Sequence, residues 1–223
     1  MTGQHAIIAG ASGLVGEELI HLLLRNDDIN NVYALSRREL PYQSKKLKQI
    51  LDPSLRINHW EEHDPTPTLG FICLGSTKKQ AGSQQALEAV DITLVRDVAK
   101  SMKMLGVKHI VVISSLGACR HSPAHYLRCK GKMEKAVTNI GFETCIFVRP
   151  GPLKGERHIP RKDELAIQRL SASLHPLMIG PLANFTPIPA EQVAKRMIEL
   201  AISATRRKLP EVVIVSGRKL LDK

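Results

Sequence analysis

Apolar residues along the chain gather into short runs that alternate with longer segments of helical periodicity. Residues 5–10 (HAIIAG) form an apolar run that stops at glycine, and residues 14–24 carry apolar side chains at helical spacing. Further strand-like runs occupy residues 32–35, 55–60, 69–74, 109–113, 144–148 and 212–215. Further helical patterns occupy residues 81–105, 122–140, 164–174 and 190–203. Strands that alternate with helices predict an α/β fold with a doubly wound parallel sheet.

The connection after the predicted strand at residues 55–60 is short. Only eight residues separate Trp60 from Leu69, and they include Pro65 and Pro67, so we expect an extended or single-turn link without a crossover helix. No repeat or linker divides the chain. We therefore expect one domain over residues 1–223, with an irregular region at about residues 151–188.

Composition excludes several classes of protein. No apolar run approaches the roughly 18 residues that span a bilayer, and the N-terminus lacks the basic segment of a secretory signal peptide. We therefore expect a cytoplasmic protein with no membrane partner. The four cysteines and the histidines His121, His125 and His158 show no metal-binding spacing with nearby carboxylates, so we expect free thiols and no metal ion.

The net charge of +11 comes from 32 basic and 21 acidic side chains. Such an excess suits a nucleic acid, an acidic membrane face or a phosphorylated ligand. The basic residues occur in short groups, and aromatic residues that could stack on bases make up only 4% of the chain. This favours a solvated basic surface and one anionic cofactor over a nucleic-acid partner.

A glycine-rich turn follows the first predicted strand and opens the first predicted helix. The segment Gly10-Ala11-Ser12-Gly13-Leu14-Val15-Gly16 carries three glycines with GxxGxxG spacing. In a Rossmann fold the first glycine allows the tight turn, the second admits a pyrophosphate and the third packs the helix on the strand. The amides at the helix N-terminus then face the anion. The turn therefore predicts a Rossmann fold that binds a dinucleotide, with a purely structural turn as the alternative.

The end of the second predicted strand bears on which dinucleotide binds. Proteins that bind NAD usually place an acidic residue there, about 20 residues beyond the glycine turn, to bond the ribose 2′-hydroxyl. This chain has Ser36, Arg37 and Arg38 and no acid before Glu39. Guanidinium groups suit a 2′-phosphate through charge-assisted hydrogen bonds. We therefore expect Arg37 and Arg38 to favour NADP over NAD, with solvent exposure of both arginines as the alternative.

A tyrosine and a lysine stand four residues apart in the sequence YLRCK, within the predicted helix at residues 122–140. This spacing places Tyr126 and Lys130 on one helical face, where the charge of the lysine favours the phenolate and hence proton transfer. Ser114 and Ser115 follow the preceding strand-like run and could hydrogen-bond a substrate oxygen. We expect these four residues to be catalytic. The alternative is a packing role for Tyr126 with Lys130 on the surface.

Several of these segments resemble a known family. GASGLVG at residues 10–16, the YLRCK helix after VVISS, and VRPGPL at residues 148–153 resemble short-chain dehydrogenase/reductases of the extended and atypical type. CLGS at residues 73–76 and SSLGA at residues 114–118 are similar to the Tat-interacting-protein-like oxidoreductases and their small bacterial NAD(P)-binding relatives. The resemblance extends from about residue 5 to residue 160.

The resemblance implies further site residues. One group would lie along the ribose and pyrophosphate of the cofactor: Leu74, Gly75, Ser76 and Thr77. A second group would border the nicotinamide: Pro150, Gly151 and Leu153. Lys130 would also hold the nicotinamide ribose. The resemblance slightly favours Ser114 over Ser115 as the partner of Tyr126, but the residues themselves leave both open.

Together these features predict an NADP-dependent oxidoreductase that transfers hydride between the nicotinamide and a small carbonyl or alcohol substrate. The alternative is a regulatory protein that senses NADP(H) and binds a partner protein without turnover, because a fold does not fix a function. A homodimer is compatible with the sequence. Arg157 and Arg161 either bind an acidic substrate group or face solvent.

Overall fold

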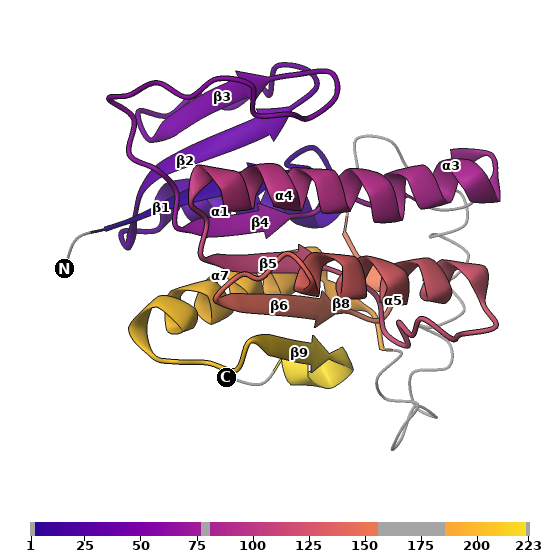
Figure 1. Cartoon of the computed structure of the whole chain (residues 1–223). Coiled ribbons are helices and arrows are strands. Elements are labelled where there is room, and N and C mark those ends of the chain that lie inside the picture. The colour runs from indigo at the N-terminus through magenta and orange to yellow at the C-terminus, as the bar shows by residue number, and fades with distance from the viewer. Residues whose placement is uncertain (1–2, 77–80, 156–185, 222–223) are drawn as a thin grey trace.

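A seven-stranded parallel sheet forms the centre of the computed structural model, which describes residues 3–76, 81–155 and 186–221. The strand order is β3-β2-β1-β4-β5-β6-β9, and each neighbouring pair runs parallel (Figure 1). These strands are β1 (Gln4–Ala9), β2 (Ile29–Ser36), β3 (Leu47–Leu51), β4 (Leu69–Ile72), β5 (His109–Ile113), β6 (Thr144–Arg149) and β9 (Val212–Ser216). A separate ladder joins β7 (Leu153–Lys154) to β8 (Ile188–Pro189). The predicted doubly wound parallel sheet is confirmed.

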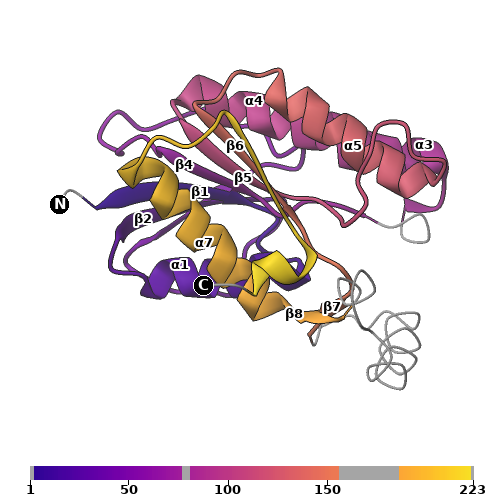
Figure 2. The same ribbon diagram turned by 90° about the horizontal axis from the view of Figure 1, so that it is seen from below.

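Helices cover both faces of this sheet (Figure 2). One face carries α1 (Leu14–Arg25) and α7 (Ala190–Arg206), which pack against each other. The other face carries α3 (Gln84–Glu88), the π-helical turn η1 (Ala89–Leu94), α4 (Val95–Leu105) and α5 (His125–Thr138). A short 3-10 helix, η4 (Gly217–Leu220), follows β9.

Strand side chains alternate between two apolar layers. Ile8 packs in the layer that contains the side chains of α1 and α7, whereas its neighbour Ile7 packs in the layer that contains those of α4 and α5. Both residues are fully buried. Burial on both faces explains why the strands appear in the sequence as near-continuous apolar runs.

The chain changes its direction of progress across the sheet beside β1. From β1 it moves outward through β2 to β3, and it then returns to β4 on the other side of β1. The connections that leave β1 and β4 therefore run in opposite directions and open a crevice at the carboxyl ends of these strands. In open α/β sheets, ligands bind at such a topological switch point.

The third strand does not lie where the sequence predicted it. β3 is Leu47–Leu51, whereas residues 55–60 form an irregular segment. The carboxylate of Asp52 accepts hydrogen bonds from two backbone amides further along the chain and from the side chain of Asn58. These bonds hold the backbone in a turn, so the alternation there reflects one-sided packing rather than a strand. As predicted, the connection to β4 contains no helix, although it spans residues 52–68.

The helix predicted at residues 81–105 contains a π-helical turn. α3 begins after Ser83, whose hydroxyl accepts a hydrogen bond from the Ala86 amide, and η1 widens the helix before α4 continues it. Gly106 ends α4 with a φ of 113°, as a C-cap glycine should. The helix predicted at residues 164–174 lies outside the described residues. The ends of the other predicted elements agree with the structure within three residues.

Candidate functional site

The glycine turn between β1 and α1 brings the backbone very close to the end of β4. Gly10 has a φ of +91°, and a β-carbon built there would lie 2.7 Å from the carbonyl carbon of Cys73. A β-carbon at Gly16 would lie 2.0 Å from the carbonyl oxygen of Gly10. Both distances are far below van der Waals contact. These two positions therefore require glycine, one for the tight turn and the other for packing of the helix on it.

Gly13 has no such structural requirement. Its φ is −89°, and a β-carbon there would meet the carbonyl oxygen of Gly10 at an ordinary 3.4 Å. Gly13 is also the N-cap of α1, and no side chain caps this helix. The first amides of α1 and the positive end of its dipole are thus available to an anion that approaches over Gly13. This arrangement admits a phosphate group.

Two cavities open at the carboxyl edge of the sheet and adjoin at Leu74 and Gly75, which line both. The outer cavity, of about 590 Å³, extends from the glycine turn to the end of β2. The inner cavity, of about 170 Å³, extends from the N-terminus of α1 to α5. We call the two together the two-part groove. It lies at the topological switch point, where a ligand is expected.

Most of the site residues predicted from the sequence line this two-part groove. The outer cavity is bordered by Gly10, Ser12, Arg37, Arg38, Leu74 and Gly75. The inner cavity is bordered by Gly13, Leu14, Val15, Leu74, Gly75, Ser76, Ser114, Ser115, Tyr126, Lys130, Pro150, Gly151 and Leu153. Gly16 lines neither cavity because it packs behind the turn, and Thr77 lies outside the described residues. Segments far apart in the sequence thus meet at one edge of the sheet.

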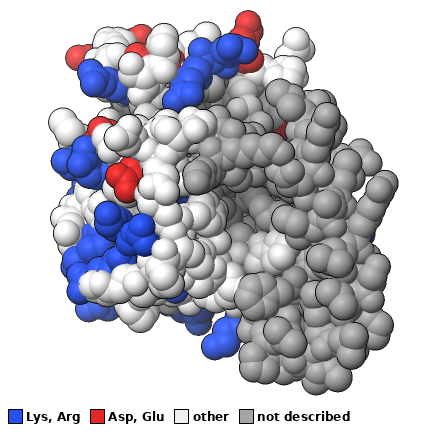
Figure 3. Space-filling view, turned by 90° about the vertical axis from the view of Figure 1, so that its right-hand side faces the viewer, with Lys and Arg blue, Asp and Glu red and all other residues white. Residues whose placement is uncertain are grey.

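The outer cavity combines exposed cations with an apolar slot. Arg37 and Arg38 follow β2 and are exposed, and the Ser36 hydroxyl donates a 2.8 Å hydrogen bond to the carbonyl of Arg38. The apolar slot is formed by side chains that sequence reasoning did not single out: Leu35, Leu40, Leu55, Val90 and Leu94. Figure 3 faces this edge of the sheet and shows more Lys and Arg than Asp and Glu on the described surface. The cavity therefore offers positive charge to an anion and apolar walls to a flat ring.

Lys130 is held in the inner cavity by a buried ion pair. Its Nζ lies 2.6 Å from Oδ1 of Asp91, and the two side chains are 3% and 0% exposed. The other carboxylate oxygen of Asp91 accepts a 3.3 Å hydrogen bond from the Ser76 amide. Gly75 leaves room for the pair, since a β-carbon there would lie 2.9 Å from Nζ. Nζ also lies 5.9 Å from the centroid of the Tyr126 ring, so the ammonium and the phenol share the inner cavity.

Sequence reasoning missed Asp91, although the sequence carried a signal. Asp91 occupies η1, at a buried position one turn after Leu87 and one turn before Val95, both of which are buried apolar residues. A carboxylate in the apolar stripe of a helix requires a buried partner. The π-helical turn marks the same place, because such turns occur frequently at functional sites, but only the structure shows it.

Ser114 and Ser115 differ in what their hydroxyl groups contact. Ser114 is buried, and its Oγ donates a 2.5 Å hydrogen bond to Oε1 of Glu134. Glu134 also accepts hydrogen bonds from Arg149, at 2.8 Å and 2.5 Å, and these raise the pKa of the arginine. Ser115 is half-buried, and its Oγ donates a long 3.4 Å hydrogen bond to the carbonyl of Leu116. The proton of Ser114 is therefore strongly held, whereas that of Ser115 is more easily given to a ligand.

Two of the cysteines are too weakly acidic to act as nucleophiles. Cys73 borders the inner cavity, and burial raises the pKa of its thiol to about 12. Burial, followed by the charge of Glu211, raises the pKa of Cys145 to about 11. Both side chains are protonated at neutral pH and lack the thiolate that reacts. All four cysteines are free, as predicted.

Sequence relatives identify the family of this chain. Residues 66–179 match the model of the HIM1 family. The chain belongs to the HIM1 family. This HIM1-family protein is 34% identical to the mitochondrial protein FMP52 of Candida glabrata, over 100% of this chain and 96% of that protein. It is 30% identical to the mitochondrial protein FMP52 of Meyerozyma guilliermondii, over 97% of this chain and 94% of that protein.

Solved structures share the fold of this HIM1-family protein. MoeE5 in complex with UDP-glucuronic acid and NAD matches with a TM-score of 0.69 at 16% identity, over 96% of this chain and 76% of that chain. A short chain dehydrogenase family protein from Francisella tularensis matches with a TM-score of 0.63 at 12% identity, over 99% of this chain and 100% of that chain. At these identities the likeness establishes the Rossmann fold alone. The narrower resemblance to the Tat-interacting-protein-like oxidoreductases stays a prediction.

The expected cytoplasmic location is wrong. The two FMP52 relatives of this HIM1-family protein are named as mitochondrial proteins. The expectation depended on the lack of a secretory signal peptide, and that feature does not separate the cytosol from the mitochondrion. Within the described residues, no helix combines the length and the apolar character that a membrane span requires.

Proposed function

We propose that this HIM1-family protein binds a nicotinamide dinucleotide in the two-part groove and catalyses the oxidoreduction of a small carbonyl or alcohol. One observation carries the proposal: Tyr126, Lys130 and Ser115 converge with the uncapped N-terminus of α1 on the inner cavity. An anion site and a proton-transfer site therefore share one space. If the glycine turn and α5 had purely structural roles, neither an anion site nor a proton-transfer site would be needed there.

The two cavities suit the two halves of a dinucleotide. The outer cavity would take the adenosine, with the ring in the apolar slot and a 2′-phosphate beside Arg37 and Arg38. The pyrophosphate would lie over Gly13 on the first amides of α1. The inner cavity would take the nicotinamide, beside Pro150 and Leu153. The solved complex of MoeE5 contains NAD, but the two arginines of this chain favour NADP.

The side chains of the inner cavity supply the proton chemistry. A bound nicotinamide would supply or accept the hydride. Tyr126 would donate a proton to the carbonyl oxygen during reduction and accept it during oxidation. Ser115 would donate a hydrogen bond to the same oxygen, because its hydroxyl proton is weakly held. The ammonium of Lys130 would stabilise the phenolate of Tyr126 and bond the nicotinamide ribose.

Asp91 and Glu134 would act as positioning residues. Asp91 fixes the ammonium of Lys130 at one place in the inner cavity, through the 2.6 Å ion pair. Glu134 holds Ser114 from one side and Arg149 from the other, which fixes the chain at the ends of β5 and β6. Pre-organised groups of this kind lower the cost of bringing reacting atoms together.

A regulatory protein that senses the dinucleotide without turnover is the second candidate. The observation that favours it is the buried ion pair, because the carboxylate of Asp91 offsets the charge of the ammonium that catalysis would use. The printed names of the FMP52 relatives state no activity. Such a sensor would bind the dinucleotide in the same groove and present the bound state to a partner protein.

We also propose a mitochondrial location for this chain, supported by the names of its relatives. Immunodetection in fractionated cells would find the protein with a mitochondrial marker. Recovery with a cytosolic marker instead would contradict the proposal.

Calorimetric titration with NADPH and NADH tests the binding, and single-turnover oxidation of bound NADPH by a panel of carbonyl compounds tests the chemistry. Tyr126→Phe removes one oxygen and keeps the ring, so cofactor affinity should be unchanged while the oxidation slows by about 10²–10⁴. Tyr42→Phe is the matched control. It removes a phenol oxygen outside both cavities and should react like the wild type.

The outcomes separate the two candidate functions. If Tyr126→Phe reacts at the wild-type rate, the catalytic role of the tyrosine is contradicted and the sensor is favoured. Tight binding of NADPH with no carbonyl compound reduced would also contradict the enzyme and favour the sensor. Failure of the wild-type protein to bind either dinucleotide would remove both candidates.

A further inference from the structure

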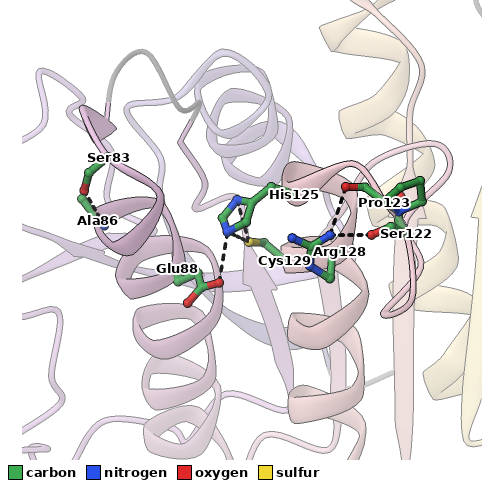
Figure 4. A network of polar contacts seen from close by, with 8 residues as sticks. All are labelled: Ser83, Ala86, Glu88, Ser122, Pro123, His125, Arg128 and Cys129. Carbon is green, nitrogen blue, oxygen red and sulfur yellow. Dashed lines mark hydrogen bonds and ion pairs between the residues drawn. The ribbon is translucent and has the colours of Figure 1, made fainter.

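A second group of reactive side chains lies next to the two-part groove without lining it. Glu88 ends α3, and His125 and Cys129 lie on α5, so a carboxylate, an imidazole and a thiol meet between two helices (Figure 4). Their potential ligand atoms all lie within 4.8 Å of one another. In the described part of the chain, none of the three borders either cavity of the groove. The proposed oxidoreductase chemistry therefore does not account for them.

We propose that Glu88, His125 and Cys129 bind a zinc ion that joins α3 to α5. Nε2 of His125 lies 3.1 Å from Oε1 of Glu88, and Sγ of Cys129 lies 3.9 Å from Nε2 and 3.6 Å from Nδ1 of the same ring. Ligand atoms about 2.0–2.3 Å from a tetrahedral zinc stand about 3.3–3.8 Å apart. The distances between the three atoms are therefore close to those between zinc ligands, and a turn of the His125 ring that directs Nε2 between the carboxylate and the sulfur would let them share one ion.

The types of ligand atom select the class of metal. Imidazole nitrogen, thiolate sulfur and carboxylate oxygen are the three ligands that zinc takes in proteins, whereas magnesium and calcium prefer sets of oxygen atoms. The thiol of Cys129 is buried, but the side chain of Glu88 is 43% exposed. The carboxylate side of the cluster is thus open to solvent, which gives the ion an entry path and a water to complete its coordination.

The helical framework places two of the ligands side by side before a metal arrives. His125 and Cys129 are one turn apart on α5 and therefore point from the same helical face. The turn that carries Glu88 is anchored at its start, because the Ser83 hydroxyl accepts a 3.0 Å hydrogen bond from the Ala86 amide (Figure 4).

A nearby positive charge is directed away from the cluster. Arg128 donates hydrogen bonds of 2.6 Å and 3.1 Å to the carbonyl oxygens of Ser122 and Pro123 (Figure 4). Its guanidinium therefore binds carbonyl oxygens of the loop before α5 and does not occupy the space between Glu88 and His125. A cation can approach the cluster without displacing it.

The sequence alone predicts no metal here because the third ligand is distant. Glu88 lies 37 residues before His125, and the histidine and the cysteine have no zinc-finger spacing. Only the packing of α3 against α5 brings the three together. The inference is independent of the proposed oxidoreductase function, since a zinc ion at this place would link α3 to α5 whether or not the protein catalyses a reaction in the two-part groove.

Titration of the chelator-treated full-length protein with cobalt(II) chloride, followed by displacement with zinc chloride, tests the site. We expect about one equivalent to bind, with the near-ultraviolet thiolate-to-cobalt band that only a cysteine ligand produces. Cys129→Ser should abolish the band. Glu88→Gln and His125→Gln should weaken binding by more than about 100-fold, because loss of a ligand exceeds the cost of losing an outer-shell partner. Cys119→Ser changes an exposed cysteine outside the cluster and should titrate like the wild type.

The variants keep the site testable even if one of them fails to fold. Glu88 is partly exposed, so Glu88→Gln should fold whatever happens to the buried Cys129→Ser, and circular dichroism checks both. Loss of binding in the cluster variants with retention in Cys119→Ser supports the site. No binding by the wild type, an unchanged band in Cys129→Ser, or unchanged affinity in Glu88→Gln would overturn it and leave a hydrogen-bonded contact between two helices.

Discussion

The hydroxyl of Ser114 donates a 2.5 Å hydrogen bond to the carboxylate of Glu134, and this contact distinguishes the two serines that follow β5. The other oxygen of Glu134 is paired with Arg149, so the carboxylate is fully engaged. A serine whose proton is held by a carboxylate cannot give it to a substrate at the same time. This geometry favours a framework role for Ser114, which we propose in place of the catalytic role that the resemblance to short-chain dehydrogenases slightly favoured.

We predict that Ser115→Ala slows carbonyl reduction more than Ser114→Ala does. Removal of a hydrogen-bond donor to a reacting oxygen typically costs about 10²–10³ in rate, so Ser115→Ala should lose about 10²-fold or more in single-turnover oxidation of NADPH. Ser114→Ala should instead lower the free energy of unfolding by about 1.5–3 kcal/mol, because one buried hydrogen bond to a carboxylate is lost. A larger rate loss in Ser114→Ala would reverse the assignment.

The buried pair of Asp91 and Lys130 provides a second prediction, on stability. Asp91→Asn leaves the ammonium buried without its counter-charge, and breaking such a pair by removing one partner costs about 3–5 kcal/mol. Guanidinium unfolding should show a loss near the lower end, since asparagine keeps one oxygen acceptor. Asp97→Asn in α4 is the matched control, because its ion pair with Arg96 is exposed and should be worth less than about 1 kcal/mol. Equal losses in the two variants would show that the buried pair has no special role.

The glycine turn and the parallel sheet could be predicted because their signals are local. Gly10 and Gly16 are required by contacts within a few residues and by the approach of the chain after β4. Both belong to the GxxGxxG pattern, so the sequence shows where the turn lies. The strand at residues 109–113 is buried on both faces, and the limits of its continuous apolar run are those of β5 in the structure. Features of this kind depend on short-range sterics and burial, which residue types encode directly.

Other features depend on long-range partners or on competing local bonds. The edge strand β3 has little apolar pattern, whereas the segment after it alternates in its residue types but is held in a turn by hydrogen bonds to the Asp52 carboxylate. Asp91 becomes a site residue only because α5 brings Lys130 to it from 39 residues away. The choice between Ser114 and Ser115 depends on Glu134, which lies on another element. Residue types alone do not encode which distant partner a side chain meets.

The arginines after β2 allow a third prediction, on cofactor choice. Arg37→Asp should weaken NADPH binding by about 2 kcal/mol or more, because a charge-assisted hydrogen bond is worth about 1.5–3 kcal/mol, while NADH binding changes much less. Calorimetric titration with both cofactors measures the difference. Lys100→Asp makes the same change of charge on the exposed face of α4, outside both cavities, and controls for long-range electrostatics. Similar losses for NADPH and NADH in Arg37→Asp would mean that this arginine does not contact a 2′-phosphate.

The last prediction separates the glycine that the fold requires from the glycine that the ligand requires. Gly13 has the extended backbone that valine readily adopts, and a β-carbon there meets only ordinary contacts, so Gly13→Val should fold with near-wild-type stability. Its branched side chain would stand where a pyrophosphate must approach the amides of α1. NADPH affinity should therefore fall by more than about 2 kcal/mol, through loss of the hydrogen bonds to charged oxygens.

Gly16→Ala is the matched comparison for this prediction and should behave in the opposite way. A β-carbon at Gly16 would lie 2.0 Å from the carbonyl oxygen of Gly10, so the turn must shift and the free energy of unfolding should fall by about 1–3 kcal/mol. Denaturant unfolding measures stability, and titration with NADPH measures binding in both variants. If Gly13→Val binds NADPH like the wild type while remaining folded, the glycine turn does not hold the pyrophosphate, because a side chain at the helix N-cap would then leave the anion site intact.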